Sequence, residues 1–509
     1  MLMDCSRFPL LRSRRRLFVA FIATCLGLST VLAPLRVTAQ NLPVLGDADR
    51  AALSPIMERK VGEEVMRDIR RDPDYLNDGP LLEYLNDFGN ILVLARPTVR
   101  GEANFNFLFF AVRDPVLNAF ALPGGFIGVH SGLLLAAQSE SELASVLAHE
   151  IGHVTQRHLA RMLGQQKNDS MIALAAMLLG ALAMRGGGDA GAAIMMGGTG
   201  FAMQRQLSFS RDAEREADRI GVAILAEGGF ETTGMVAFFG RLQAASRNYS
   251  DAIPPYLLTH PLTTERIADI EARIRDQRYR QRVDSLDFQL IRARARVLQD
   301  SSEKGLRDAQ LIFENQLRLN IKPQTVAAKY GMAFVALKQR AYEKAERLFK
   351  EANAAAAPAK PSVVLTDLGI EIKSAENQTG EALTLATAAL NQFPLSRSMA
   401  HQYANTLIAN KQLPQATLYL REQARLYRQD AEIQDLLAKA YAGQGKQALQ
   451  HMALAESYVL AGSLPAAIIQ LDIARKAPDA QFYEQAVIDA RERELKERWK
   501  DEQADAKDR

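Results

Sequence analysis

The chain has 509 residues, with 62 Lys and Arg against 59 Asp and Glu. The basic excess lies in the first 39 residues, and the rest carries 56 basic and 58 acidic side chains. That near-neutral balance gives no reason to expect a nucleic-acid-binding protein. About 470 residues are enough for two or three domains with cores of their own.

A secretory signal peptide is predicted at residues 1–39. Arginines crowd the start, an apolar run (17–33) follows, and a Val-x-Ala sequence ends at Ala39, where we expect cleavage. The alternative is an uncleaved membrane anchor, although the apolar run is shorter than the ~20 residues that span a bilayer. Cys5 and Cys25 would leave with the signal, so the mature protein would have no disulfide.

The next segments predict a small sheet followed by a helix. NFLFFAV (106–112) has the composition of a strand. NAFALPGGFIGVHSGLLLA (118–136) predicts a strand, a Pro-Gly-Gly turn, a second short strand and the start of a helix. Residues 139–165 then predict a helix, because Ser139 and Glu142 form a capping box and apolar residues follow at helical spacing.

The predicted helix carries the sequence HEIGH. Histidines at positions i and i+4 lie on one helix face, so His149 and His153 could bind one cation, and zinc favours such nitrogen ligands. Glu150 is placed to take a proton from a metal-bound water. The alternative is a hydrogen-bonded polar patch on a surface helix, although this motif seldom arises by chance in a chain with seven histidines.

His158 does not fit the longer metalloprotease motif, which needs glycine at 156 and histidine at 159. Gln156 and Leu159 stand there instead. On a continuous helix His158 would point away from His153, so we interpret it as an ordinary surface residue.

A third ligand is sought in FSRDAEREADRIG (209–221). Glu214 and Asp218 are four residues apart on one face of a predicted helix, whereas Glu216 points away. A carboxylate from this second helix would complete a His, His, Glu site and leave a fourth position open. Spacing alone does not choose among the acids of this helix.

Residues 171–203 form two apolar runs separated by glycines, the first too short to span a bilayer as a helix. We expect a buried hairpin that covers the core. A hairpin that dips into a membrane face is the alternative.

From residue 290 onward the sequence predicts helices rich in alanine, leucine and glutamine, with a period of 34 residues in two pairs of alanines. These are Ala382 and Ala416, and Ala404 and Ala438. Segments 329–352 and 454–478 carry the tetratricopeptide pattern of small and aromatic residues. We expect a tetratricopeptide-repeat solenoid at 291–490, followed by a charged tail at 491–509. A plain helical bundle is the alternative.

Four segments together, NAFALPGGFIGVHSGLL, LAHEIGHVTQRHLAR, FSRDAEREADRIG and LLTHPLTTERI, followed by the helical region, carry a family resemblance. The chain resembles the periplasmic β-barrel assembly-enhancing proteases, which are gluzincin metallopeptidases related to the membrane-bound CAAX prenyl proteases. The resemblance covers most of the mature chain. It implies a mostly α protein, with an α+β zincin-type metallopeptidase domain (40–290) followed by an all-α tetratricopeptide solenoid.

The resemblance also implies the site and its chemistry. It implies one zinc ion per chain, held by His149, His153 and Glu214, with Glu150 as the general base. Asp218 would be a proton donor or would orient a ligand, and such residues tune a metal site.

The function implied is that of a periplasmic zinc metalloendopeptidase and chaperone-like factor. Such a protein would promote assembly of outer-membrane β-barrel proteins and degrade misfolded or stalled ones. The partners implied are these clients and, through the repeat domain, the β-barrel assembly machinery; peripheral membrane contact is left open. The strand around 117–122 would pair with an extended substrate. A chaperone with a usually silent protease is compatible with this function. An adaptor with a dead metal site is disfavoured, because every catalytic position is intact.

His260 precedes Pro261, which disfavours helix in the residue before it. From the residues alone, His260 could simply cap a loop. The resemblance implies that it takes the open zinc position as an inhibitory fourth ligand and keeps the enzyme latent. If it is not such a ligand, a catalytic role such as oxyanion stabilisation is the remaining interpretation.

Overall fold

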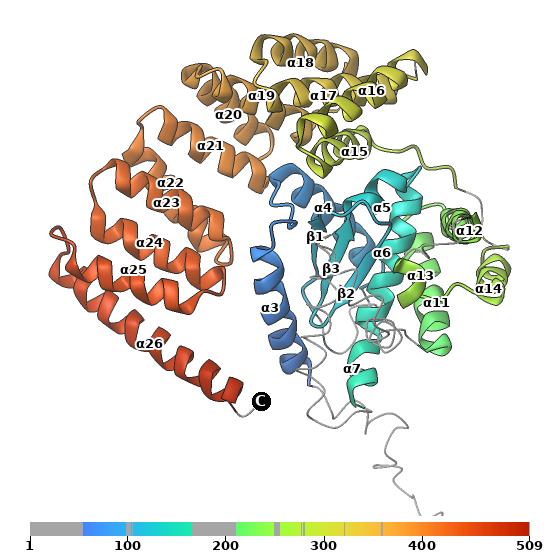
Figure 1. Cartoon of the computed structure of the whole chain (residues 1–509), viewed down its shortest axis with the longest axis horizontal. Coiled ribbons are helices and arrows are strands. Elements are labelled where there is room, and N and C mark those ends of the chain that lie inside the picture. Colours follow the sequence, from blue (N-terminus) through green and yellow to red (C-terminus); the bar gives the residue numbers. More distant parts are fainter. Residues whose placement is uncertain are drawn as a thin grey trace, which may run out of the picture. The chain divides into compact units, whose positions relative to one another are not determined.

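The structure is a computed structural model that describes residues 54–97, 103, 105–164, 210–248, 255–275, 277, 280–319, 321–357 and 360–507 (Figure 1). The predicted signal peptide (1–39) and apolar hairpin (171–203) lie outside these residues. Among the described residues, no helix combines the length and the apolar character needed to cross a membrane.

The first part of the chain builds a three-stranded sheet, as the sequence predicts. Helices α3 (Pro55–Arg71) and α4 (Gly79–Ala95) precede strands β1 (Leu108–Val112), β2 (Ala119–Leu122) and β3 (Phe126–His130). The strand order is β1-β3-β2, with β3 parallel to β1 and antiparallel to β2. Gly124 and Gly125 form the turn between β2 and β3 with φ of +79° and +95°, values that favour glycine. Because β3 is its only partner among the described strands, β2 lies at an edge of this sheet.

Seven further helices belong to the described part of this region, and α5 and α6 contact the sheet (Figure 1). They are α5 (Ser131–Ala136), α6 (Glu140–Thr155), α7 (His158–Gly164), α11 (Arg211–Glu227), α12 (Thr233–Asn248), α13 (Pro255–Thr259) and α14 (Thr264–Ile274). Ser139 caps α6, because its Oγ accepts a hydrogen bond from the Glu142 N–H at 3.2 Å. Every residue of α6 is buried, and the helix packs against β2, α4, α11 and α12. The HEIGH helix is thus a central element of the core.

The single helix predicted over 139–165 is wrong in one respect. Helix α6 ends at Thr155, Arg157 adopts a φ of 52°, and a separate helix α7 begins at His158. A residue with an ordinary side chain rarely takes that left-handed conformation. Arg157 is held there by Glu58 of α3, whose carboxylate accepts a hydrogen bond from the Arg157 Nε at 2.6 Å. The break changes the direction in which His158 points.

The rest of the described chain is helical. Its helices are α15 (Leu286–Gln299), α16 (Glu303–Leu319), α17 (Lys322–Lys338), α18 (Tyr342–Ala356), α19 (Val363–Ala375), α20 (Thr379–Gln392), α21 (Arg397–Ala409), α22 (Leu413–Leu426), α23 (Ala431–Gly443), α24 (Gln447–Leu460), α25 (Leu464–Lys476) and α26 (Phe482–Lys507). A mostly α protein with a small sheet is therefore confirmed.

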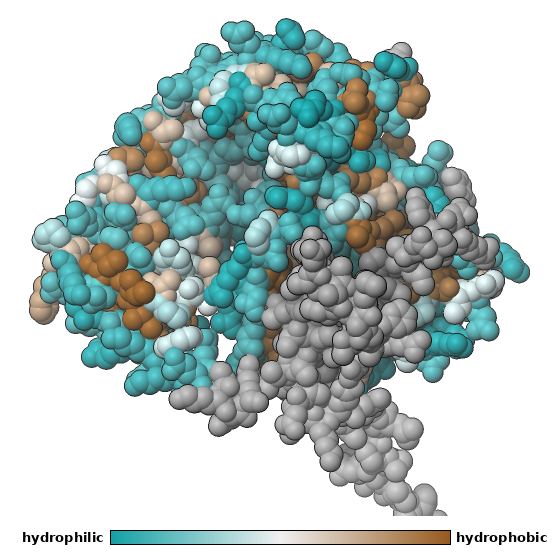
Figure 2. Space-filling model, in the orientation of Figure 1, coloured by the Kyte–Doolittle hydropathy of each residue, from teal (hydrophilic) through white to brown (hydrophobic). Residues whose placement is uncertain are grey.

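The geometry of these helices is compatible with 34-residue repeats. The four alanines of the predicted period are all buried between helices. Left-handed turn residues recur at Asn377, Lys411 and Gly445, each 34 positions after the last. The tetratricopeptide assignment itself stays a prediction. Where Figure 2 colours the surface by hydropathy, hydrophilic residues predominate over small hydrophobic patches, as expected for amphipathic helices that bury one side.

Helix α15 joins the region that contains the sheet to the C-terminal helical region. The domain boundary predicted at residue 290 falls inside it, and its buried side chains, such as Phe288 and Ile291, belong to a core that includes residues of both regions. Arg294 of α15 also pairs with Asp78, the N-cap of α4, at 2.7 Å. The division into two separate domains stays a prediction.

Candidate metal centre and active site

Two helices come unusually close at the HEIGH sequence. A Cβ added to Gly152 would lie 3.0 Å from the backbone of Ala217 in α11. One added to Gly221 of α11 would lie 3.0 Å from the Met235 side chain and 3.3 Å from the backbone nitrogen of His149. Larger side chains at these glycines would push α6 and α11 apart. The small residues therefore let the carboxylates of α11 reach the histidines of α6.

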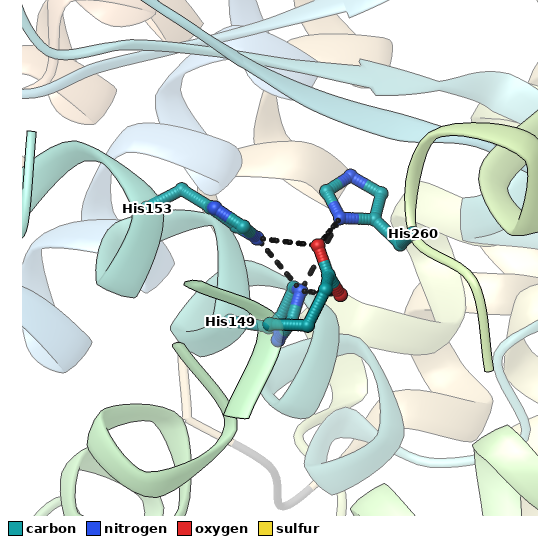
Figure 3. A group of neighbouring side chains, drawn as sticks. His149, His153 and His260 are labelled. Atoms are coloured by element: carbon teal, nitrogen blue, oxygen red, sulfur yellow. Dashed lines mark hydrogen bonds and ion pairs between the residues drawn. The ribbon is translucent and has the colours of Figure 1, made fainter. Parts of the chain in front are cut away.

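The predicted ligand residues converge on one point (Figure 3). Nε2 of His153 lies 3.0 Å from Nε2 of His149, which lies 3.4 Å from Nδ1 of His260. Oε1 of Glu214 lies 3.0 Å from the same Nδ1 and 3.4 Å from Nε2 of His153. All four residues are at most 2% exposed.

These spacings fit a metal ion. In a tetrahedral zinc site with bonds of 2.0–2.1 Å, the ligand atoms lie about 3.3 Å from one another. The four ligand atoms here all lie within 4.8 Å of one another, and imidazole nitrogens with a carboxylate oxygen are donors that zinc prefers. The residues present therefore fit a metal ion.

The charges of the group fit a cation as well. Burial would raise the pKa of Glu214, but His260, His149 and His153 lower it well below its ordinary value. Burial would lower the pKa of His149, but Asp218 and Glu214 raise it to about 9. Burial lowers the pKa of His153 well below its ordinary value. An ionised carboxylate among imidazoles would hold a metal ion in place of a proton.

Glu150 lies next to this group and outside it. The side chain is completely buried, and its Oε1 is 3.5 Å from Nε2 of His260. Burial raises the pKa of Glu150, an effect that His260 and His149 oppose. His260 follows the short helix α13 and turns one ring nitrogen to the ligand group and the other toward Glu150. In this structure His260 therefore contacts both the other members of the ligand group and the predicted base.

Asp218 holds the outer nitrogen of His149. Its Oδ1 lies 3.0 Å from the His149 Nδ1. Arg266 of α14 donates to both carboxylate oxygens of Asp218, at 2.7 and 2.8 Å, and its Nη1 lies 2.6 Å from Oε2 of Glu214. Burial would raise the pKa of Asp218, but Arg266 and His149 lower it. This geometry favours a residue that orients His149 over a proton donor.

The role of Arg266 could not be recognised in the sequence. It donates to the Pro261 carbonyl oxygen at 2.8 Å, and therefore connects the His260 loop to α11. The only sequence signal is an arginine that falls on the buried face of a short amphipathic helix, where it is 3% exposed. A buried charge of this kind needs partners, which here are Asp218 and Glu214.

The interpretation of His158 as a surface residue is wrong. The side chain is 3% exposed, and its Nδ1 lies 2.8 Å from Nδ1 of His153. The error follows from the helix break at Arg157, which turns α7 back so that His158 faces His153. Burial lowers the pKa of His158 to about 4, although Glu216 opposes this effect.

Comparisons with known proteins agree with this site. The model of peptidase family M48 matches residues 91–274, which include all the residues described above. The β-barrel assembly-enhancing protease of Escherichia coli (strain K12) is 31% identical over 96% of this chain and 99% of its own length. The protein of the same name from Yersinia pestis is 32% identical over 92% of this chain and 96% of its own. A mitochondrial metalloendopeptidase of Schizosaccharomyces pombe is 32% identical over 34% of this chain and 48% of its own.

The family match and the buried histidine and carboxylate group define the class of protein as a metalloendopeptidase. Similarity to the bacterial relatives extends over nearly the whole chain and includes the C-terminal helices. The chain belongs to the family of β-barrel assembly-enhancing proteases.

Proposed function

We propose that this protein is a zinc metalloendopeptidase of the periplasm that promotes assembly of outer-membrane β-barrel proteins and degrades misfolded or stalled ones. One zinc ion per chain would be held by His149, His153 and Glu214. The observation that carries the proposal is the set of buried ligand atoms within 4.8 Å of one another, beside a buried glutamate.

The chain's own residues supply the proton transfers. When bound, zinc would polarise the substrate carbonyl and make the attacking water more acidic. Glu150 would accept the proton of that water and return it to the leaving amine. Burial raises the pKa of Glu150, which makes its carboxylate a better proton acceptor for the first step. Asp218, held by Arg266, would keep His149 in the orientation that ligation needs.

The edge strand β2 is the proposed binding site for the scissile segment. It pairs with β3 on one side and packs against α6, the helix that carries Glu150. An extended peptide can add to such an edge through backbone hydrogen bonds. This mode reads the backbone and not a particular side chain, and therefore suits unfolded clients.

The proposed enzyme would be latent while His260 takes the ligand position that the attacking water needs. This proposal is supported by the His260 ring, which lies within the ligand group and turns its Nε2 to Glu150 at 3.5 Å. Release would require the loop after α13 to move, and loops that gate active sites are common. We propose that client engagement drives this movement.

The partners proposed follow from the relatives, which are named for enhancing β-barrel assembly. The C-terminal helices would bind the assembly machinery or its clients. A predominantly chaperone-like function remains compatible with this arrangement, whereas an adaptor with a dead metal site does not need the intact ligand group. The alternative of a peripheral membrane contact involves residues 171–203, which lie outside the described part of the chain.

Replacing Glu150 with Gln tests the enzymatic proposal. We expect cleavage of casein and of an unfolded outer-membrane protein to fall by about 10²–10⁴-fold, with zinc content by elemental analysis unchanged. Glu303→Gln, at an exposed position in α16, is the control and should cleave like wild type. Cleavage by Glu150→Gln at the wild-type rate would refute the assignment. Assembly-promoting activity that survives in Glu150→Gln would separate the two functions.

A further inference from the structure

The two α6 histidines of the proposed site differ in what their outer ring nitrogens contact, that is, the Nδ1 atoms that face away from the ligand group. His149 turns its outer nitrogen to an ionised carboxylate, that of Asp218. His153 turns its outer nitrogen to another histidine, His158, at 2.8 Å. Neither the family motif nor the mechanism above uses His158.

His158 is itself fixed on its far side. Its Nε2 lies 3.1 Å from Oε2 of Glu216 in α11, and the same oxygen accepts a hydrogen bond from Nη2 of Arg161 in α7 at 2.8 Å. The Glu216 and Arg161 side chains are 27% and 39% exposed. A continuous chain of contacts therefore runs from the surface pair Arg161 and Glu216, through the buried His158, to His153.

The contacts fix where the protons lie. A nitrogen beside a carboxylate oxygen must carry a proton, so the His158 Nε2 is a donor and, in the neutral ring, its Nδ1 is an acceptor. The His153 Nδ1 facing it must then be a donor, because two acceptors would not hold a 2.8 Å contact. That leaves the lone pair of His153 on Nε2, the atom that lies among His149, Glu214 and His260. This arrangement satisfies both contacts of the His158 ring and points the lone pair of His153 into the ligand group, where Nε2 and Glu214 Oε1, 3.4 Å apart, would share a bound metal ion in place of a proton.

We propose that His158 is a positioning residue which, anchored by Glu216 and Arg161, selects the tautomer and ring orientation of His153 for metal binding. This role rests on the proposed metal centre.

The use of a histidine here has an electrostatic reason. Glu214 and Asp218 already place two carboxylates around the ligand group, and Glu150 lies beside it. A carboxylate directly behind His153 would add another buried negative charge, which is costly without a partner. Here the neutral ring of His158 contacts His153 on one side and Glu216 on the other. Glu216 can therefore orient His153 while its charge stays near the surface beside Arg161.

The test compares His158→Leu, which cannot accept a hydrogen bond, with His158→Asn, which can. The readouts are zinc affinity in competition with a chelator and the visible spectrum of the cobalt-loaded protein, both on the full mature chain. We expect His158→Leu to bind zinc about 10–100-fold more weakly and to shift the cobalt spectrum. His158→Asn should recover most of both properties. A side chain that only fills the core would not show this rescue.

A second pair of variants works at the surface, where folding is not at risk. Glu216→Ala removes the anchor of His158 and should weaken zinc binding several-fold, whereas Asp212→Ala changes an exposed acid of the same helix and should not. Wild-type zinc affinity and cobalt spectrum in both His158→Leu and Glu216→Ala would overturn the positioning role. Absence of zinc binding by the wild-type protein would instead overturn the proposed metal centre.

Discussion

Two of the buried clusters of charged side chains among the described residues are built on opposite plans. In the first, three histidines and Glu214 turn their ligand atoms toward a common point. In the second, at the junction of α4, α15 and α19, the guanidinium of Arg294 occupies the middle. It lies 2.7 Å from Asp78, 2.8 Å from Glu371 and 3.5 Å from Asp367.

The difference shows how a binding cluster can be told from a structural one. A buried acid needs a positive partner or a hydrogen-bond donor. The Arg294 cluster supplies its own permanent cation, and Tyr330 accepts a further hydrogen bond from it at 3.0 Å. The histidine cluster has no such cation at its centre, although Arg266 flanks its carboxylate. That centre therefore suits a bound cation such as a metal ion.

The largest effect is expected from removing a ligand. Glu214→Ala should reduce bound zinc from one per chain to near zero and abolish proteolysis, because it removes the anionic ligand of the group and leaves only imidazoles to hold a dication. Elemental analysis after gel filtration measures this change. Full zinc occupancy in Glu214→Ala would show that another residue is the third ligand.

Breaking the second cluster should instead reduce stability. Arg294→Met leaves three acidic side chains without their cation, a type of change that costs about 3–5 kcal/mol. Urea denaturation should show this loss, whereas zinc content of the folded protein should not change. Arg307→Met, at an exposed position in α16, is the control and should stay within about 0.5 kcal/mol of wild type. Wild-type stability in Arg294→Met would mean that the cluster does not hold α15 to its neighbours.

Opening the fourth position of the first cluster should raise activity. His260→Ala keeps His149, His153 and Glu214, so zinc content should stay at the wild-type level. With the imidazole gone, water can reach the site beside Glu150, and we expect cleavage of unfolded proteins to increase several-fold. Casein cleavage and self-cleavage measure this effect. Full zinc with unchanged or lower activity would show that His260 is no inhibitory ligand and would favour a catalytic role.

Local spacing in the sequence indicated only part of the first cluster, the pair His149 and His153, whereas the choice of Glu214 and His260 came from the family resemblance. Histidines four apart on a helix must share a face, and a helix with acids four apart can face them. The interpretation of His158 was wrong because helical spacing was applied as if one continuous helix ran from residue 139 to residue 165. The left-handed Arg157 depends on Glu58, 99 residues away in the chain, and no local pattern reports such a contact.

The second cluster could not be predicted, because its members come from separate helices without any motif. Asp78 and Arg294 are 216 residues apart, and Arg294 and Glu371 are 77 apart. From the sequence, Arg294 is one arginine among several on a helix. Its burial follows only from the way α15 packs against α17 and α19, which depends on the tertiary fold.

The smallest expected effect concerns the pH dependence of the second cluster. One guanidinium cannot neutralise three carboxylates, and Asp367 is the most buried of them, at 1% exposure. Burial, together with the charge of Glu371, raises the pKa of Asp367 from 3.8 to about 8, although Arg294 opposes this shift. Asp367 therefore keeps a proton in the folded protein at pH values where the unfolded chain has released it.

Between about pH 4 and pH 8, the folded state binds one more proton at Asp367 than the unfolded state, so this group makes stability fall as pH rises. Asp367→Asn stays neutral at every pH and can still accept the hydrogen bonds that Ser398 and Gln402 donate, at 2.9 and 3.0 Å. Relative to wild type, the variant should therefore gain stability with increasing pH, by up to about 1.4 kcal/mol per unit. Urea denaturation of the zinc-saturated proteins at pH 6, 7 and 8 measures that difference. The histidine cluster is unchanged in the variant, so its own titration cancels in the comparison. Parallel pH profiles would mean that Asp367 is ionised in the folded protein and that the Arg294 cluster, unlike the histidine cluster, tolerates all its charges without an added proton or metal ion.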